Sequence, residues 1–122
     1  MAVNARALQR ATIIGTVLQV LMVVAGHYST SIASLFAVGG MLFSLIAGHI
    51  YAHLARERGL GLAALGGAIA GGLCGLIGIM LSVLLGDVPV SLLIFGTLSS
   101  AVTGAIGGLL WAVVKGKAKA EV

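Results

Sequence analysis

Two histidines and a glutamate follow one another at four-residue intervals, as His49, His53 and Glu57. Residues four apart share one face of an α-helix, so this spacing could present two imidazoles and a carboxylate to a divalent metal ion. The same stretch lies where a membrane helix would leave the bilayer, and a polar face at that place needs no ligand. Both interpretations stay open at this point, and we expect no resident cofactor.

Neutral polar residues lie inside the long apolar runs of the chain. Gln19 falls near the middle of the first run, and Ser44 and Thr103 lie within later ones. In lipid such groups commonly form hydrogen bonds between helices, although they could also line a path for a substrate or an ion. Proton-coupled transporters generally need an ionisable group deep in a span. No acidic residue occupies such a position here, so we do not expect a proton-driven antiporter.

Catalytic motifs are missing from the sequence. It has no P-loop and no GxSxG pattern, and its loops are too short to hold a soluble active site. The single cysteine, Cys74, lies in an apolar run, which excludes an intrachain disulfide and a thiolate metal cluster. We therefore expect that the protein is not an enzyme.

Glycine gives the most specific pattern, with 19 residues, most of them inside apolar runs. Small side chains at four-residue spacing let two helix backbones approach closely, and close approach is a main source of packing energy in lipid. The pattern predicts a close helix pair within one subunit, a contact face between subunits, or a glycine-lined pore. The two stripes are Ala63, Gly67, Gly71 and Gly75, and then Gly96, Ser100, Gly104 and Gly108.

Membrane helices must position all of these residues. The chain has 122 residues, of which 60% are hydrophobic and 8% charged, whereas soluble domains have about 25% charged residues. Lipid offers backbone groups no hydrogen bonds, so the spans must be helical. We predict one all-α domain over 1–122, a four-helix transmembrane bundle running up-down-up-down. The expected helices cover about 11–28, 31–55, 62–85 and 89–114, with a polar tail at 115–122.

Positive charge predicts the orientation of this bundle. All seven cations lie in the N-terminal segment, in the connection between the second and third spans, or in the C-terminal segment. The positive-inside rule places these three segments, and with them both termini, in the cytoplasm. Short loops and the lack of an organelle signal favour a bacterial inner membrane. The cations flank apolar runs and form no stripe, so we expect no nucleic-acid partner.

Local signals predict how the spans end. Gly59 follows two arginines and suits the stop of the second span, and Asp87 with Pro89 suits the cap and first turn of the fourth. Tyr51 and Trp111 fall near the inner membrane interface and Tyr28 near the outer one, as in an aromatic belt.

A shift of 60 residues aligns the two predicted helical hairpins. Gly15 then matches Gly75, and Gly26 matches Gly86. The matches are few in a sequence of such biased composition, and they predict a weak parallel internal repeat.

The layout resembles two kinds of membrane protein. Four spans in a chain of this length are similar to the small multidrug resistance transporters. The membrane-embedded glutamate that this resemblance implies for the first helix has no counterpart here, where Gln19 is the nearest polar group. A basic N-terminus followed by two hairpins is also similar to the four-span accessory protein encoded with bacterial ATP synthases. Many proteins share that layout, and we assign no family from it.

Glycine stripes without buried charge favour a structural or accessory subunit. Such a subunit would lie in the lipid bilayer and associate with itself or with a larger membrane complex through its glycine-rich faces. One alternative is a small oligomeric transporter or channel that uses Gln19, Ser44 and Thr103 as a polar path. A second alternative is metal or cofactor binding at His49 and His53.

Overall fold

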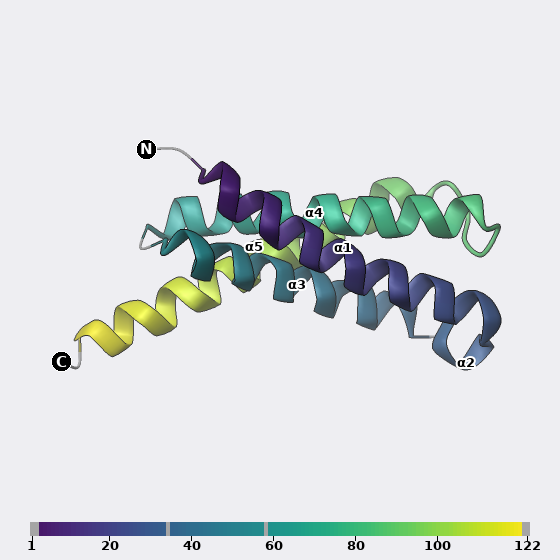
Figure 1. Ribbon diagram of the computed structural model, residues 1–122, viewed down its shortest axis with the longest axis horizontal. Helices are drawn as coiled ribbons and strands as arrows, with labels where there is room; N and C mark the ends of the chain where they lie inside the picture. Colours follow the sequence, from purple (N-terminus) through teal and green to yellow (C-terminus); the bar gives the residue numbers. More distant parts are fainter. Residues whose placement is uncertain (1–2, 34, 58, 121–122) are drawn as a thin grey trace.

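Four long helices form a bundle in the computed structural model, which describes residues 3–33, 35–57 and 59–120 (Figure 1). Each of the four is long and apolar enough to cross a membrane. The prediction of an all-α, four-helix transmembrane bundle is thus confirmed. In chain order the helices are α1 (Ala5–Tyr28), the short α2 (Thr30–Ala33), α3 (Phe36–Ala55), α4 (Leu60–Leu84) and α5 (Leu92–Ala120).

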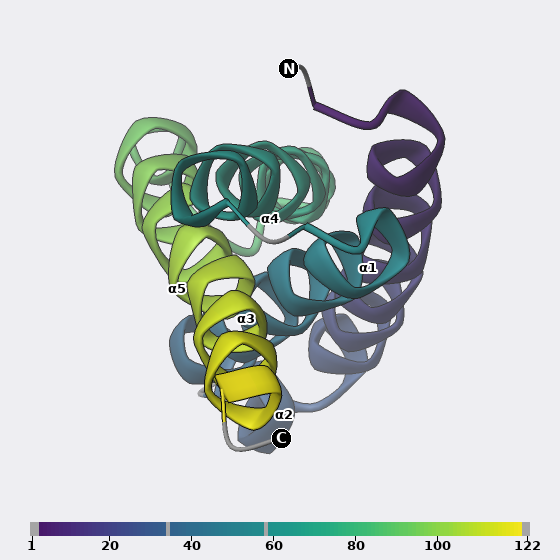
Figure 2. The ribbon, with the colours of Figure 1, turned by 90° about the vertical axis from the view of Figure 1, so that its left-hand side faces the viewer.

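The long helices alternate in direction, and the two ends of the chain lie at the same end of the bundle (Figure 1). Helices α3 and α4 are central, because each of them packs against the three other long helices. Seen along the bundle, α1 and α5 lie on opposite sides (Figure 2). The bundle is therefore built on the α3–α4 pair, with one further helix on each flank.

The described ends of α1 and α5 extend beyond the predicted ranges. Asn4 caps α1, and its side-chain oxygen accepts a hydrogen bond from the Ala7 amide at 3.1 Å. Arg6 and Arg10 therefore lie inside α1, where arginine is a good helix former. The expected tail from residue 115 is helical as far as Ala120, because its lysines and alanines also favour a helix.

The second predicted span is divided. Its first residues form α2, and α3 begins only at Phe36, so the prediction of one helix from Ser31 is wrong. Ser34, between the two, lies outside the described residues. The 60-residue repeat stays a prediction. Gly26 is buried inside α1, whereas its partner in the alignment, Gly86, lies in a turn with φ of +79°.

Helix α3 ends in a hydrogen-bonded turn that uses an arginine. Arg56 adopts the left-handed conformation, with φ of 52°. Its amide bonds the carbonyl of His53, and the Glu57 amide bonds the carbonyl of Ala52 at 3.0 Å. These two bonds define a Schellman motif, in which glycine is the usual left-handed residue. The prediction that Gly59 stops this helix is wrong, because Gly59 is the N-cap of α4.

Helix α4 ends in the same motif, here with a glycine. Gly86 takes the left-handed position, and the Asp87 amide bonds the carbonyl of Ser82 at 3.0 Å. The following turn leads into α5, which begins at Leu92, so Pro89 precedes the helix and is not in its first turn. Asp87 bonds a residue of α1 (described below), and its predicted role as the cap of the last span is not supported.

The small-residue stripes meet at the centre of the bundle. A Cβ added at Gly104 would overlap the carbonyl of Gly67, and one added at Gly48 would overlap the carbonyl of Gly104. The backbones of α3, α4 and α5 therefore touch, which only small residues allow. The other residues of the two predicted stripes also make contacts between helices: Gly71 faces Gly104, Gly75 faces Ser100, Gly108 faces Ala63, and Gly96 faces Ile79.

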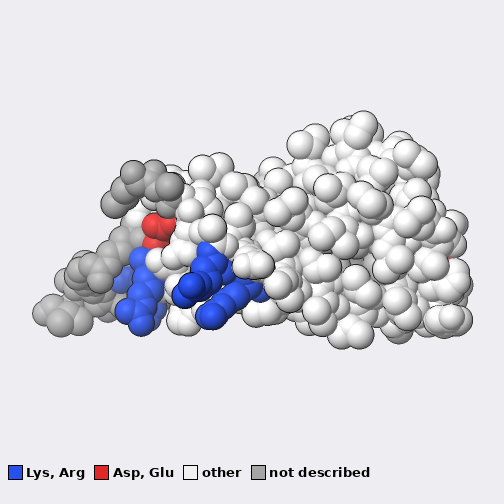
Figure 3. Space-filling model, turned by 45° about the horizontal axis from the view of Figure 1, so that its top comes forward, with Lys and Arg blue, Asp and Glu red and all other residues white. Residues whose placement is uncertain are grey.

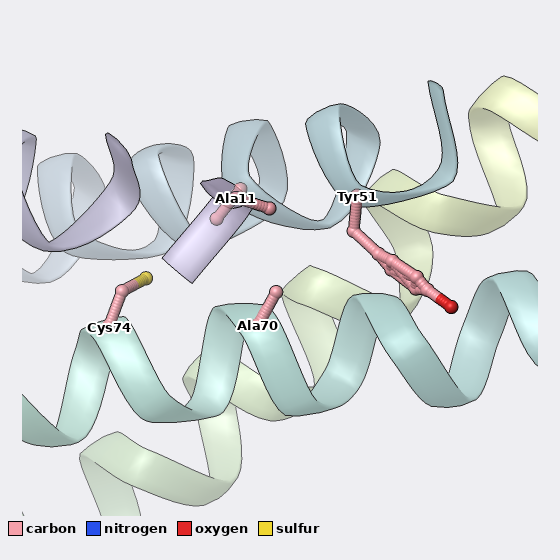
Figure 4. Packing of buried hydrophobic residues seen from close by; sticks show 5 residues of the cluster. Ala11, Tyr51, Ala70 and Cys74 are labelled. Atoms are coloured by element: carbon pink, nitrogen blue, oxygen red, sulfur yellow. The ribbon is translucent and has the colours of Figure 1, made fainter. Parts of the chain in front are cut away.

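A second close contact joins α1 to the central pair. A cluster of buried side chains that includes Ala11, Tyr51, Ala70 and Cys74 fills this space (Figure 4). Tyr51 is fully buried, and Trp111 is only 8% exposed, whereas Tyr28 is 84% exposed. The prediction that Tyr51 and Trp111 form an interfacial belt is therefore wrong, since both rings pack between helices.

Charge is confined to the ends of the bundle. The described Lys and Arg side chains gather near one end, and the long middle of the visible face is without charge (Figure 3). They belong to the start of α1 and the ends of α3 and α5, which the alternating topology brings together. Arg58 and the side chains of Lys117 and Lys119 lie outside the described residues. We call this end the cationic end and the opposite one the turn end.

Candidate functional site

A pocket of about 440 Å³ lies in the turn-end half of the bundle, between α1, α3, α4 and the beginning of α5. Its volume falls in the range of about 300–1,000 Å³ that is common for small-molecule sites. Most of its surface is apolar, with a few polar groups at the base and at the mouth. Large apolar side chains on its walls include Met22, Phe36, Met41, Ile79, Leu92 and Phe95.

Gln19 is the polar group at the base of the pocket. It is 3% exposed, and its Nε2 donates a hydrogen bond to the carbonyl of Gly40 at 3.0 Å. The same nitrogen lies 3.3 Å from the hydroxyl of Ser44, which in turn donates to the carbonyl of Gly71 at 3.2 Å. This chain of hydrogen bonds connects α1, α3 and α4 at the middle of the bundle.

Cys74 completes the cluster at the base. Its sulfur donates to the carbonyl of Gly71 at 3.3 Å and lies 3.9 Å from both Gln19 Nε2 and Ser44 Oγ. Glycines let α1 come this close, since an added Cβ at Gly15 would lie 2.9 Å from the Cys74 sulfur, and one at Gly78 would lie 2.9 Å from Cβ of Gln19. The sequence marked Gln19 and Ser44, but it did not show that Cys74 joins them.

The bundle is closed beyond this cluster. Ser44 is fully buried, and neither it nor Thr103 lines the pocket. Thr103 bonds the carbonyls of Ser99 and Ser100 on its own helix, each at 3.1 Å. Of the three residues of the predicted polar path, Gln19 and Ser44 are therefore joined at the base of the pocket, and Thr103 is not joined to them.

A histidine and an aspartate meet at the turn-end side of the pocket, which we call its mouth. Nδ1 of His27 lies 3.0 and 3.1 Å from the two carboxylate oxygens of Asp87. The contact joins the end of α1 to the turn between α4 and α5, and Asp87 lines the pocket. Sequence reasoning missed this pair. His27 falls at the end of the predicted helix 11–28 and Asp87 in the connection after 62–85, on the same side of the membrane, and that shared side was the available signal.

Ser82 lies on the α4 wall of the same pocket. It is 2% exposed, and its hydroxyl has no hydrogen-bond partner among the described residues. Buried hydroxyls are almost always hydrogen-bonded in native proteins. This hydroxyl therefore has unused hydrogen-bonding capacity beside the pocket.

The predicted metal-ligating residues are not brought together. Nδ1 of His53 accepts a hydrogen bond from the indole of Trp111 at 3.2 Å, and Glu57 accepts one from the Tyr51 hydroxyl at 3.2 Å. The left-handed turn at Arg56 takes Glu57 off the helical face that carries the histidines. His49 is exposed on α3. Across the described ranges, no three His, Cys, Asp or Glu side chains are grouped so as to hold a metal ion.

Comparisons of the chain with protein-family models, with curated proteins and with solved structures find no match. The four apolar helices indicate a small polytopic membrane protein in contact with the lipid bilayer. Any more specific function must be argued from the pocket, its polar base and its mouth.

Proposed function

We propose that this protein is not an enzyme but a small transporter, which binds an amphipathic molecule in the pocket and carries it across the membrane. The pocket supports this proposal because it ends on a polar cluster at mid-bundle and is closed beyond it. A site that lies in one half of the bundle, with the other half closed, fits what alternating access requires of each of its two states, with substrate bound near the membrane midplane.

The polar groups at the base of the pocket limit how transport could be driven. Gln19 and Ser44 are neutral hydrogen-bonding groups, and neither can carry a proton as a buried carboxylate does. Opening toward the cationic end would need α3, α4 and α5 to part where Gly48, Gly67 and Gly104 now touch. We therefore propose transport that is not driven by protons, with the glycine contact as the closed gate.

Filling the pocket tests whether it is a binding site. A Cβ added at Gly40 would meet Gln19 and Met22 at 3.6 and 3.9 Å, which are ordinary contacts, so Gly40→Leu would place its larger atoms beside the base. Gly61→Leu is the matched control, because a Cβ there meets nothing within 4 Å. Native mass spectrometry of the protein in its own lipids should detect a bound small molecule in the wild type and in Gly61→Leu. Its presence in Gly40→Leu too would contradict the proposal.

Transport itself is tested with the molecule so identified. Uptake into liposomes that contain the protein should exceed uptake into empty liposomes, and Gln19→Leu should abolish the excess. Leucine keeps the bulk of the side chain but removes the hydrogen bonds to Gly40 and Ser44. Circular dichroism would show that the variant is still folded. Equal uptake by wild type and Gln19→Leu would argue against a carrier that uses the polar cluster at the base of the pocket.

A structural or accessory subunit is the second candidate. The glycine stripes no longer support this candidate, because those of α4 and α5 face each other within the subunit. One observation still favours it, namely that Gly40, Gly75, Gly78 and Gly96 line the pocket, and small residues accept a neighbouring helix. The Gly40→Leu experiment separates the two candidates. Loss of a co-purifying protein, and not of a small molecule, would favour the accessory role.

A further inference from the structure

The described partner of the carboxylate at the pocket mouth is the imidazole of His27, and not a Lys or Arg side chain. The contacts described for Asp87 are both to Nδ1 of His27, which can share a single hydrogen between the two oxygens. A carboxylate offers about four acceptor sites, so most of its capacity remains. The described Lys and Arg side chains belong to the opposite, cationic end (Figure 3). When the imidazole is neutral, the mouth therefore carries a negative charge.

A second acceptor belongs to the residue whose backbone carbonyl bonds the Asp87 amide. The Asp87 amide bonds the carbonyl of Ser82, so the two residues are neighbours at the end of α4. Ser82 lines the pocket, and its Oγ is buried and has no partner among the described residues. The C-terminal end of α4 adds partial negative charge at the same place. Carboxylate, hydroxyl and helix end all favour a positively charged group that donates hydrogen bonds.

The remainder of the pocket fits an apolar body. Phe36, Met41 and Phe95 line it between the mouth and the base. Gln19 at the base and His27 at the mouth are eight residues apart on α1, which corresponds to about 12 Å of helix. The pocket can therefore take a molecule with a charged head at one end and an apolar body of roughly this length.

We infer that the ligand is a primary amine with an apolar body, its ammonium group held by the carboxylate of Asp87 and the hydroxyl of Ser82. An ammonium group has three donors and no acceptor, which matches this pair of acceptors. An anionic ligand would meet the charge of Asp87, and a neutral one would bring no positive charge to it. The inference rests on the proposed function and adds to it the class of molecule.

A matched set of probes tests the inference on the full-length protein in lipid nanodiscs. Phenylbutylamine, phenylbutanol and phenylbutyrate share a ring and a chain and differ in the charge of the head group. Phenylbutylamine should bind most tightly. Asp87→Asn should weaken it roughly tenfold, as expected for the loss of one charge-assisted hydrogen bond, and leave phenylbutanol unchanged. Ser82→Ala should weaken the amine to a smaller extent.

Three further variants serve as controls. Asp87→Glu keeps the charge and His27→Gln keeps a donor beside it, so both should retain the preference for the amine. Glu57→Gln removes a carboxylate at the cationic end and should change nothing. An alcohol that binds as tightly as the amine, or an Asp87→Asn variant with unchanged amine affinity, would overturn the inference while leaving pocket binding in place. If none of the three probes binds, the inference is also overturned. The proposed function is tested separately, by whether Gly40→Leu loses the small molecule that co-purifies with the wild type.

Discussion

The hydroxyl of Tyr51 connects three segments of the chain at the cationic end. It accepts a hydrogen bond from the amide of Asn4 at 3.0 Å and donates one to Glu57 at 3.2 Å. Its ring lies against Gly66 of α4, in a space that a side chain at that position would fill. One residue of α3 thus fixes the start of α1, the connection after α3 and the first turns of α4.

Removing this hydroxyl should cost stability. Tyr51→Phe keeps the ring in place but leaves the Asn4 amide without its partner, and we expect the free energy of unfolding to fall by about 1 to 2 kcal/mol. Unfolding by sodium dodecyl sulfate in bicelles would measure it. Tyr28→Phe is the control, since Tyr28 is 84% exposed. Equal effects of the two substitutions would show that the Tyr51 hydrogen bonds contribute nothing.

Arg56 should be improved by glycine. Its φ of 52° is unfavourable for a residue with a Cβ, so Arg56→Gly should raise the free energy of unfolding by about 1 kcal/mol. Arg56→Ala separates conformation from charge, because it removes the charge and keeps the Cβ. If Ala stabilises as much as Gly in the same unfolding assay, then the backbone conformation is not the reason.

At the scale of helices, the contact of α4 with α5 depends on particular glycines. A Cβ at Gly104 would overlap the carbonyl of Gly67, whereas a Cβ at Gly72 would lie 3.4 Å from Cβ of Ala101, an ordinary contact. We expect Gly104→Ala to reduce the free energy of unfolding by about 1 to 3 kcal/mol, the usual cost of overpacking. Gly72→Ala, in the same helix pair, should have little effect. A similar loss in both variants would mean that glycine content, and not the close approach at Gly104, determines packing.

Helices were easier to predict from the sequence than their ends. A span needs about 20 apolar residues, and the four runs show it plainly. Ends depend on single residues and their neighbours. Gly59 has the composition of a helix stop, yet the chain turns at Arg56, where the bonds of the Schellman motif are made. The break between α2 and α3 was missed because the polar residues before it, Ser29, Thr30 and Ser31, were interpreted as the N-cap of one continuous span.

At the scale of the molecule, the predicted site was only partly recovered. Gln19 and Ser44 were visible as polar groups in an apolar run, and one cluster contains both. The clusters at the base and mouth also use Cys74, Ser82, His27 and Asp87, which come together only when the helices pack. The histidine–glutamate spacing, in contrast, assumed a continuous helix, and α3 ends before Glu57. Sequence spacing predicts contacts within one helix, whereas most of this pocket is made between helices.

The placement of charge predicts the orientation of the whole bundle in the membrane. Cations of α1, α3 and α5 share one end, and the positive-inside rule places that end in the cytoplasm. In a Cys74→Ala background, Val90→Cys in the turn before α5 should react with a membrane-impermeant maleimide added to intact cells. Gly61→Cys, at the start of α4, should react only after the membrane is opened. Both positions are exposed in the structure, so access depends on the side of the membrane. Labelling of Gly61→Cys in intact cells, with Val90→Cys protected, would contradict the predicted orientation. It would mean that the pocket mouth faces the cytoplasm.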